Sequence, residues 1–283
     1  MEIGTVGVIG VGTMGSGIVE VVARNGLHVV AREATPELVE AGRARVEGSM
    51  DRGVARGKLD EVVREAALAA VTWTTDLEDL AGCDLVLEAV PENLPLKLEI
   101  LGVLDRVLDA GAIMATNTSS IPIIDVAMGT SRPEQVLGMH FFNPATVMKL
   151  VEVISTQLTA PAVTEAATAF ATDTLGKRVV PAPDRAGFVV NKLLVPYICQ
   201  AIEMYESQHA SATDIDDAMK LGAGHPMGPL TLADLIGLDV CLFTAESLYA
   251  EYAERFYAPP PLLRRMVAAG RLGRKTGRGF YEY

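Results

Sequence analysis

The chain has 283 residues, of which 49% are apolar, and its 36 acidic and 24 basic residues give a net charge of −12. A chain of this length can bury roughly 75% of its unfolded surface and can form two domains. The acidic balance argues against a nucleic-acid binder, because neutralising a phosphate backbone needs a basic face. We find no stretch of about 18 uninterrupted apolar residues, so we expect no membrane helix.

The three cysteines, Cys83, Cys199 and Cys241, are odd in number, far apart and set among apolar residues. This pattern predicts buried, reduced thiols in a reducing compartment. The first β-prone run also begins almost at Met1, which leaves no segment for a signal or transit peptide. We therefore expect a cytoplasmic protein. No spacing of cysteine and histidine is typical of a zinc site, so no metal is expected.

The chain opens with a predicted strand at residues 5–9, followed by the motif G-x-G-x-x-G and an apolar helical pattern. Strand, glycine motif and helix in this order predict a dinucleotide-binding unit. Gly10 permits a tight turn, Gly12 lets a pyrophosphate approach the backbone, and Gly15 allows the helix to pack closely on the strand. A plain glycine turn is the alternative for the motif alone.

The phosphates of a bound dinucleotide would lie at the start of this helix, at Thr13 and Met14, where free N–H groups and the helix dipole favour anions. The next predicted strand, residues 27–31, ends at Arg32 and Glu33. Glu33 follows the glycine motif at close to the spacing of about 20 residues expected for the carboxylate that binds the adenosine ribose. Such a carboxylate repels a 2′-phosphate and favours NAD over NADP, although Arg32 could accept that phosphate.

Residues 35–65 have a mostly helical pattern and form the most charged part of the first half of the chain. A local basic run, made of Arg52, Arg56 and Lys58, follows Ser49 in this segment. A charge run is usually a solvated helix face. In an acidic protein, however, an anionic substrate would need a local basic patch of this kind.

Residues 84–90 are almost continuously apolar, as expected of a buried parallel strand. The strand leads into Glu92, and Lys97 follows on the next predicted helix. Ligands gather outside the carboxyl ends of such strands. The two residues are therefore either ligand contacts or a pair that caps the helix.

Another predicted strand, residues 112–116, ends in a loop that contains Ser119 and Ser120. A hydroxyl at the end of a strand can donate to a substrate oxygen, and it can equally cap the helix that follows. Two adjacent serines allow both roles.

Residues 136–154 are predicted to form two strands joined by a turn at Asn143 and Pro144. An apolar strand seldom carries a charge unless that charge is paired or solvated. The two strands can therefore bring His140 and Glu152 side by side. A carboxylate in that position fixes the tautomer of the imidazole and stabilises the imidazolium that forms when the ring takes a proton. In the alternative, His140 caps a strand and Glu152 faces water.

The stretch 181–187, rich in proline and ending in glycine, is the clearest domain boundary in the chain. Beyond it the apolar residues recur at helical spacing only. We therefore expect an α/β fold: a Rossmann-like, mostly parallel sheet domain at residues 1–183, followed by an all-helical domain at residues 187–283. A predicted helix at residues 230–248 is apolar on much of its circumference, which indicates pairing of two subunits as a homodimer.

The segment G-M-H-F-F-N-P, followed by M-K-L-V-E-V-I, resembles the signature of the 3-hydroxyacyl-CoA dehydrogenases. The likeness extends from residue 6 to residue 281 and is greatest to the short bacterial members that act on 3-hydroxybutyryl-CoA. It implies NAD as cofactor, an acyl-CoA as substrate, and an active site in the cleft between the two domains.

The resemblance also implies roles for the polar residues. His140 would take the proton of the 3-hydroxyl group while C3 delivers a hydride to the nicotinamide, and Glu152 would hold His140. Ser119 and Asn191 would bind the substrate oxygens, which leaves Ser120 as the better candidate for the helix cap.

The remaining site residues expected from the motif and the resemblance fall into two groups. The expected contacts to the cofactor are Gly10, Gly12, Thr13, Met14, Gly15, Glu33, Glu92, Lys97, Ser119, Asn143 and Lys275. The expected contacts to CoA and the rest of the substrate are Ser49, Arg56, Ser119 and Asn191.

Two other functions stay open from the residues alone. One is a related NAD-dependent dehydrogenase of a hydroxy acid without CoA, such as gulonate, which would not need the basic run near Ser49. The other is a structural protein that only holds the dinucleotide. The complete set of Ser119, His140, Glu152 and Asn191 argues against that second alternative.

Overall fold

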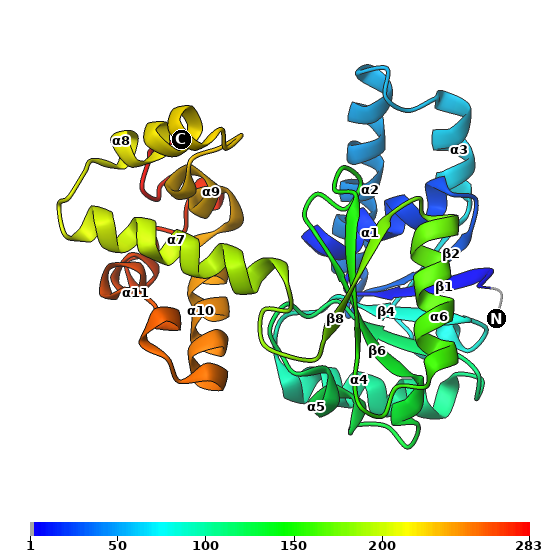
Figure 1. The fold of residues 1–283 in the computed structure, drawn as a ribbon. Coiled ribbons are helices and arrows are strands. Elements are labelled where there is room, and N and C mark those ends of the chain that lie inside the picture. Colours follow the sequence, from blue (N-terminus) through cyan, green and yellow to red (C-terminus); the bar gives the residue numbers. More distant parts are fainter. Residues whose placement is uncertain (1–2) are drawn as a thin grey trace. The chain divides into compact units, whose positions relative to one another are not determined.

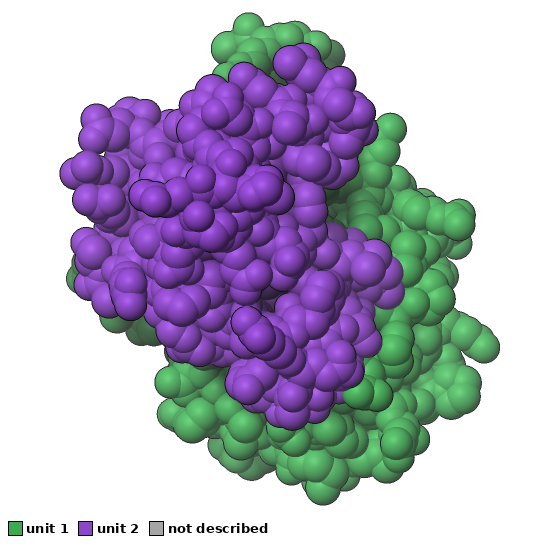
Figure 2. Space-filling view, turned by 60° about the vertical axis from the view of Figure 1, so that its left-hand side comes forward, with its two compact units in different colours: residues 1–185 green, residues 186–283 purple. Residues whose placement is uncertain are grey.

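The computed structural model describes residues 3–283. The chain divides into two compact units, Met1–Arg185 and Ala186–Tyr283, shown in green and purple in Figure 2. Each unit has a hydrophobic core of its own, because separate clusters of buried apolar side chains fill the two.

The first unit is built on one eight-stranded sheet with the strand order β3-β2-β1-β4-β5-β6-β7-β8 (Figure 1). The first six strands are parallel, β7 runs antiparallel to β6, and β8 runs parallel to β7. The expected Rossmann-like, mostly parallel sheet is therefore confirmed. The strand order reverses between β1 and β4, and in such sheets ligands bind at the carboxyl ends of the strands at this point.

The strands are β1 (Thr5–Ile9), β2 (His28–Arg32), β3 (Val71–Thr74), β4 (Leu85–Glu88), β5 (Ile113–Thr116), β6 (Val136–Phe141), β7 (Leu150–Ser155) and β8 (Arg178–Pro183).

The helices of the first unit are α1 (Thr13–Arg24), α2 (Pro36–Ala55), α3 (Glu61–Ala69), α4 (Leu94–Val107), α5 (Ile123–Ala127) and α6 (Pro161–Ala169), with a π-helical turn at Phe170–Thr174. The segment expected to be mostly helical from residue 35 to 65 forms α2 and α3, which lie side by side (Figure 1). Arg64 joins them through an ion pair of 2.6 Å to Asp51. β8 continues into Pro181 and Pro183, which a strand at the edge of a sheet tolerates because its outer side needs no N–H donors.

The second unit contains helices only, apart from two isolated bridges near its C-terminus: α7 (Val190–Glu206), α8 (Ala212–Asp217), α9 (Pro229–Ile236), α10 (Leu238–Tyr252) and α11 (Pro261–Ala268). The single helix expected over residues 230–248 is wrong. The chain breaks at Gly237, whose φ of 106° lies outside the range of a helix and is open only to glycine. α9 and α10 are therefore two helices; both pack against α7, whereas α8 contacts α9 and α11 contacts α10.

The three cysteines are free and buried. Burial raises the pKa of Cys83 and of Cys199 to about 12, so both thiols stay protonated near neutral pH. Among residues 3–283, no helix combines the length and the apolar character that crossing a membrane requires.

Candidate active site

The glycine motif forms the turn between β1 and α1. Gly10 has a φ of 84°, and a side chain there would come within 2.8 Å of the Ala89 carbonyl oxygen. A side chain on Gly15 would come within 1.8 Å of the Gly10 carbonyl oxygen, so this position needs glycine for packing. Around Gly12, by contrast, none of the described residues lies within 4 Å of where a side chain would begin. The backbone is thus open to a ligand at Gly12, and the first turn of α1, from Thr13 on, offers its N–H groups to an anion.

Glu33 lies at the end of β2 and is tied to the glycine turn. Its carboxylate accepts a hydrogen bond of 2.6 Å from the Val11 N–H and one of 3.2 Å from the Ala34 N–H. A carboxylate oxygen accepts more than one hydrogen bond, so this arrangement still allows a contact to a ribose hydroxyl. Arg32 donates instead to the Thr75 carbonyl at 3.1 Å, which holds its guanidinium at the end of β3.

Lys97 and Glu92 lie together at the start of α4, but a third residue joins them. The Lys97 ammonium donates to both carboxylate oxygens of Glu88, at 2.8 and 2.9 Å, and lies 3.5 Å from Glu92. The Lys97 and Glu88 side chains are each 1% exposed, whereas Glu92 is 26% exposed. Asn93 caps α4, so the pair does not have the capping role that was its alternative.

Glu92 connects this cluster to Ser119. Its Oε1 accepts hydrogen bonds from the Ser119 N–H at 2.7 Å and from the Ser119 hydroxyl at 3.2 Å. Its Oε2 accepts one from the Thr118 hydroxyl at 2.8 Å. The carboxylate therefore fixes both the backbone and the side chain of the serine at the end of β5.

Ser120 does not cap the helix that follows it, contrary to expectation. Its hydroxyl oxygen is buried and has no hydrogen-bond partner among the described residues. Asp184 caps α5 instead, since its carboxylate accepts from the N–H groups of Ile123 and Ile124 at 2.7 and 2.8 Å. A carboxylate from a distant part of the chain makes charge-assisted bonds with these amides, which a local serine pattern does not reveal.

His140 and Glu152 face each other across β6 and β7, where the antiparallel register pairs them directly. His140 Nδ1 lies 2.7 Å from Glu152 Oε2, and the Glu152 side chain is 0% exposed. The alternative in which Glu152 faces water is therefore wrong. An ionised carboxylate only accepts, so the ring proton lies on Nδ1 and the neutral ring carries its lone pair on Nε2. The ring packs edge-on against Phe142, with centroids 4.6 Å apart.

The turn after β6 carries Asn143, whose bond to Pro144 is cis. Lys177 holds this turn by donating to the carbonyl oxygens of Ala145 and Met148, at 2.6 and 2.8 Å. Burial lowers the pKa of Lys177, and the nearby Arg24 lowers it further. Asn143 is exposed at the surface of the turn.

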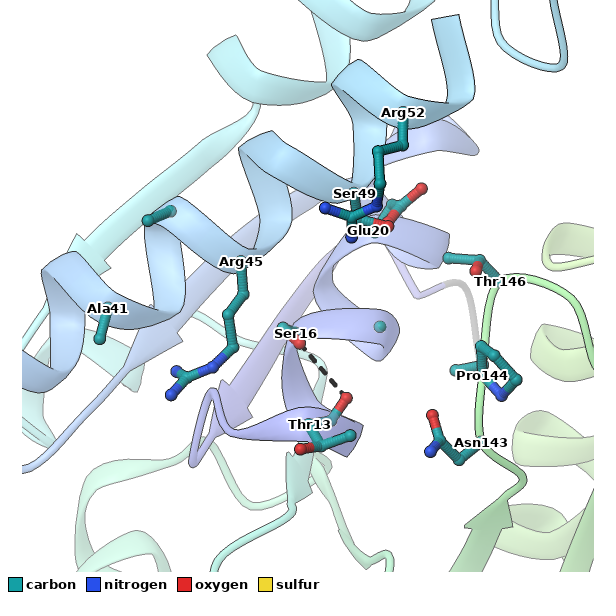
Figure 3. Close-up of a pocket in the computed structure, with 13 residues that line it drawn as sticks. Thr13, Ser16, Glu20, Ala41, Arg45, Ser49, Arg52, Asn143, Pro144 and Thr146 are labelled. Carbon is teal, nitrogen blue, oxygen red and sulfur yellow. Dashed lines mark hydrogen bonds between the residues drawn. The ribbon is translucent and has the colours of Figure 1, made fainter. Parts of the chain in front are cut away.

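A groove with a volume of about 520 Å³ lies between α1, α2 and this turn (Figure 3). Arg45, Ser49 and Arg52 line it from one face of α2, and Asn143 lines it from the opposite side. Arg56, at the C-terminal end of α2, does not line the groove. Of Ser49 and Arg56, the residues that the resemblance implies as contacts to the CoA moiety, the groove therefore contains Ser49 and not Arg56.

Asn191 and Lys275 belong to the second unit. Asn191 is half-buried in the first turn of α7. Lys275 is exposed, and its ammonium lies 2.5 and 2.6 Å from the carboxylate oxygens of Asp239.

Both units match one protein family along nearly their whole length. Residues 5–185 match the 3-hydroxyacyl-CoA dehydrogenase NAD binding domain, and residues 187–283 match the C-terminal domain of 3-hydroxyacyl-CoA dehydrogenase. The chain belongs to the 3-hydroxyacyl-CoA dehydrogenase family. The resemblance noted in the sequence is confirmed, and so is NAD as the dinucleotide of the first domain.

Proteins of this family are similar to the chain over nearly their full length. The chain is 51% identical over 279 residues to the 3-hydroxybutyryl-CoA dehydrogenase of Mycobacterium tuberculosis H37Rv, covering 98% of each protein. It is 43% identical over 283 residues to the probable 3-hydroxybutyryl-CoA dehydrogenase of Bacillus subtilis 168, covering 100% of this chain and 98% of that protein. The crystal structure of (S)-3-hydroxybutyryl-CoA dehydrogenase from Ralstonia eutropha is similar with a TM-score of 0.94 at 45% identity, over 100% of this chain and 99% of that one.

Sequence reasoning missed several residues that support the candidate site. Glu88 could have been predicted as a site residue, because it is an acidic residue in an otherwise apolar strand, the same feature that singled out Glu152. Asn117 accepts a hydrogen bond of 2.8 Å from the Phe141 N–H and so ties β6 to the loop after β5. For Asn117, Lys177 and Asp184 no local pattern points to their partners, which are distant in the sequence.

Proposed function

We propose that the protein is an NAD-dependent dehydrogenase that interconverts (S)-3-hydroxyacyl-CoA and 3-ketoacyl-CoA, with 3-hydroxybutyryl-CoA as its preferred substrate. The observation that carries the proposal is the buried His140–Glu152 pair, with 2.7 Å between Nδ1 and Oε2, in the sheet that also carries the glycine turn. The proposed length of the acyl chain is taken from the names of the relatives at 43–51% identity.

In this proposal His140 acts as the general base. Nε2 takes the proton of the substrate 3-hydroxyl group, and the Glu152 carboxylate stabilises the imidazolium that results. NAD, when bound, accepts the hydride from C3. In the reverse direction the imidazolium returns the proton to the oxygen of the 3-keto group. The hydroxyl of Ser119 and the amide of Asn191 bind the substrate oxygens.

The first domain fits NAD on the evidence of its own residues. The backbone is open at Gly12, and the glycines at positions 10 and 15 permit the tight turn and the close start of α1. Glu33 holds the glycine turn and would accept a hydrogen bond from the adenosine ribose, and its charge would disfavour a 2′-phosphate. Glu92, Ser119, Asn143 and Lys275 complete the proposed contacts to the cofactor, whereas Lys97, whose side chain is 1% exposed, supports them through Glu92.

The test is to follow oxidation of reduced nicotinamide spectroscopically with a panel of 3-ketoacyl-CoA substrates, using NADH and NADPH in parallel. We expect the highest kcat/KM with acetoacetyl-CoA and NADH. Faster turnover of a hydroxy acid without CoA would favour a gulonate-type enzyme and contradict the proposal. Binding of NADH without turnover of any substrate would indicate a dinucleotide-binding structural protein.

We propose that the groove along α2 receives the phosphate-bearing part of CoA. Arg45 and Arg52 supply positive charge on its wall, and Ser49 between them supplies a hydroxyl. Arg56 was also expected to contact CoA but lies outside the groove. The effects of replacing Arg52 and Arg56 can therefore be compared.

We expect Arg52→Ala to raise the KM for acetoacetyl-CoA by about threefold to fivefold, as for one solvent-exposed charge contact. Arg56→Ala, which alters the same charge outside the groove, is the matched control and should change KM less. The measurement is steady-state kinetics with acetoacetyl-CoA and with the acetoacetyl thioester of N-acetylcysteamine, which carries no phosphate. A larger effect of Arg56→Ala, or equal effects on both thioesters, would contradict the assignment of Arg52.

We propose that the protein is a homodimer that associates through its second unit. Large apolar side chains are exposed there, among them Leu221 at 85%, Leu193 at 73% and Phe256 at 54%. A second copy would cover such residues, which are costly in water. Sedimentation equilibrium should give twice the mass of the chain, and a monomer at micromolar concentration would contradict the proposal.

We also propose that the protein is cytoplasmic, because its three cysteines are free and buried.

A further inference from the structure

Glu88 lies at the carboxyl end of β4 and is completely buried. Its carboxylate accepts four hydrogen bonds. Two come from the Lys97 ammonium at 2.8 and 2.9 Å, one from the Thr116 hydroxyl at 2.8 Å, and one from the Val90 N–H at 2.7 Å. With its side chain 1% exposed, Glu88 offers no surface to substrate or cofactor, so any role in function must act through the residues that it holds.

Glu88 can affect the site by holding Lys97, which lies beside Glu92. Lys97 is held against Glu88 and lies 3.5 Å from Glu92, which is the most exposed member of the cluster. Glu92 in turn accepts from the N–H and the hydroxyl of Ser119. Because Glu88 balances the charge of Lys97, the Glu92 carboxylate stays bonded to Ser119 and is not drawn fully to the ammonium.

Glu88 can also affect the glycine turn, because it holds the loop that packs against Gly10. The Val90 N–H, which donates to Glu88, lies 2.9 Å from where a side chain on Gly10 would begin. The loop after β4 and the turn after β1 are therefore packed against each other, and Glu88 fixes the first of them. β1 and β4 are also direct neighbours in the sheet, with Ile9 paired to Glu88.

We propose that Glu88 is a positioning residue that holds Lys97, Glu92 and Ser119, and the loop beside Gly10, in the arrangement that binds the dinucleotide. The inference rests on the proposed function, in which Glu92 and Ser119 contact the cofactor. Without the charge of Glu88, the Lys97 ammonium would turn to the Glu92 carboxylate and withdraw it from Ser119.

The test is Glu88→Gln, which keeps the shape of the side chain and removes its charge. We expect the Kd for NADH to rise about tenfold, the order of one charge-assisted hydrogen bond. The KM for acetoacetyl-CoA should rise less than the Kd for NADH, since Ser119 is the one member of the cluster proposed to contact the substrate and the groove along α2 lies apart from it. Kd is measured by fluorescence titration of NADH, and KM by steady-state kinetics at saturating NADH.

Asp105→Asn is the matched control. Asp105 lies near the other end of the same helix, α4, and pairs with Arg132 at 3.0 Å, outside the candidate site. Both substitutions remove one carboxylate charge from an ion pair of the first unit and should lower the melting temperature. Only Glu88→Gln should change the Kd for NADH. An unchanged Kd in folded Glu88→Gln would overturn the proposal.

A double substitution keeps the proposal testable if Glu88→Gln does not fold. Glu88→Gln combined with Lys97→Met leaves no unpaired buried charge, and it is compared with Lys97→Met alone. If Glu88 acts through Lys97, the two variants bind NADH with the same Kd. A further loss of affinity in the double variant would show that Glu88 also acts through the Val90 N–H, and a wild-type Kd in the double variant would overturn the proposal. Failure of the wild-type protein to turn over any 3-ketoacyl-CoA would instead refute the proposed function, whatever the variants do.

Discussion

His140→Gln is expected to lower kcat by at least about 10²-fold, because positioned acid–base catalysis contributes typically about 10²–10⁴-fold. Glutamine keeps a polar side chain of similar reach but exchanges no proton near neutral pH. The pair that the histidine forms with Glu152 is buried and short, at 2.7 Å, and glutamine has no imidazole to put in its place. The Kd for NADH should stay nearly unchanged, since the glycine turn and Glu33 are untouched.

The measurement is steady-state kinetics together with a fluorescence titration of NADH on the same purified variant. His28→Gln is the control, since this histidine is exposed at the start of β2, where its Nε2 lies 3.4 Å from the Thr72 hydroxyl. Loss of NADH binding or of folding together with activity would show that His140 is structural. A variant that retains most of its activity would refute the mechanism.

Glu152→Gln is expected to lower kcat by about 10²-fold, which is less than the roughly 10⁴-fold loss for the equivalent change in a serine protease triad. The amide does not stabilise an imidazolium as a carboxylate does, and it can turn its NH₂ group toward Nδ1 and favour the wrong tautomer. The register of β6 and β7, which pairs His140 with Glu152 directly, still holds the ring in place and limits the loss.

Glu152→Asp serves as the companion variant, because it keeps the charge but withdraws it by one methylene group. We expect its kcat to lie between those of the wild type and Glu152→Gln. Rates are measured in both directions at saturating substrates. If Glu152→Gln and the wild type have the same kcat, Glu152 only fills space beside the histidine.

The sequence by itself determined the features whose cause is local. The glycine motif between a strand and a helix needs only adjacent residues, since the turn at Gly10 and the close contact at Gly15 are made within one βα unit. The pairing of His140 with Glu152 was also predictable, because the two strands are consecutive, joined by residues 142–149, and the period of two along each strand places both side chains on one face.

Only the tertiary structure decided which distant groups meet. Burial of Glu88 follows from an apolar strand, but its partner Lys97 lies on the next helix, and the same pattern is compatible with several partners. Asp184 caps α5 from a segment far along the chain, and Lys177 holds the turn that carries Asn143, by bonds that no local spacing encodes. An apolar or charged pattern specifies that a side chain is buried or paired, whereas the identity of its partner depends on how the strands are ordered in the sheet.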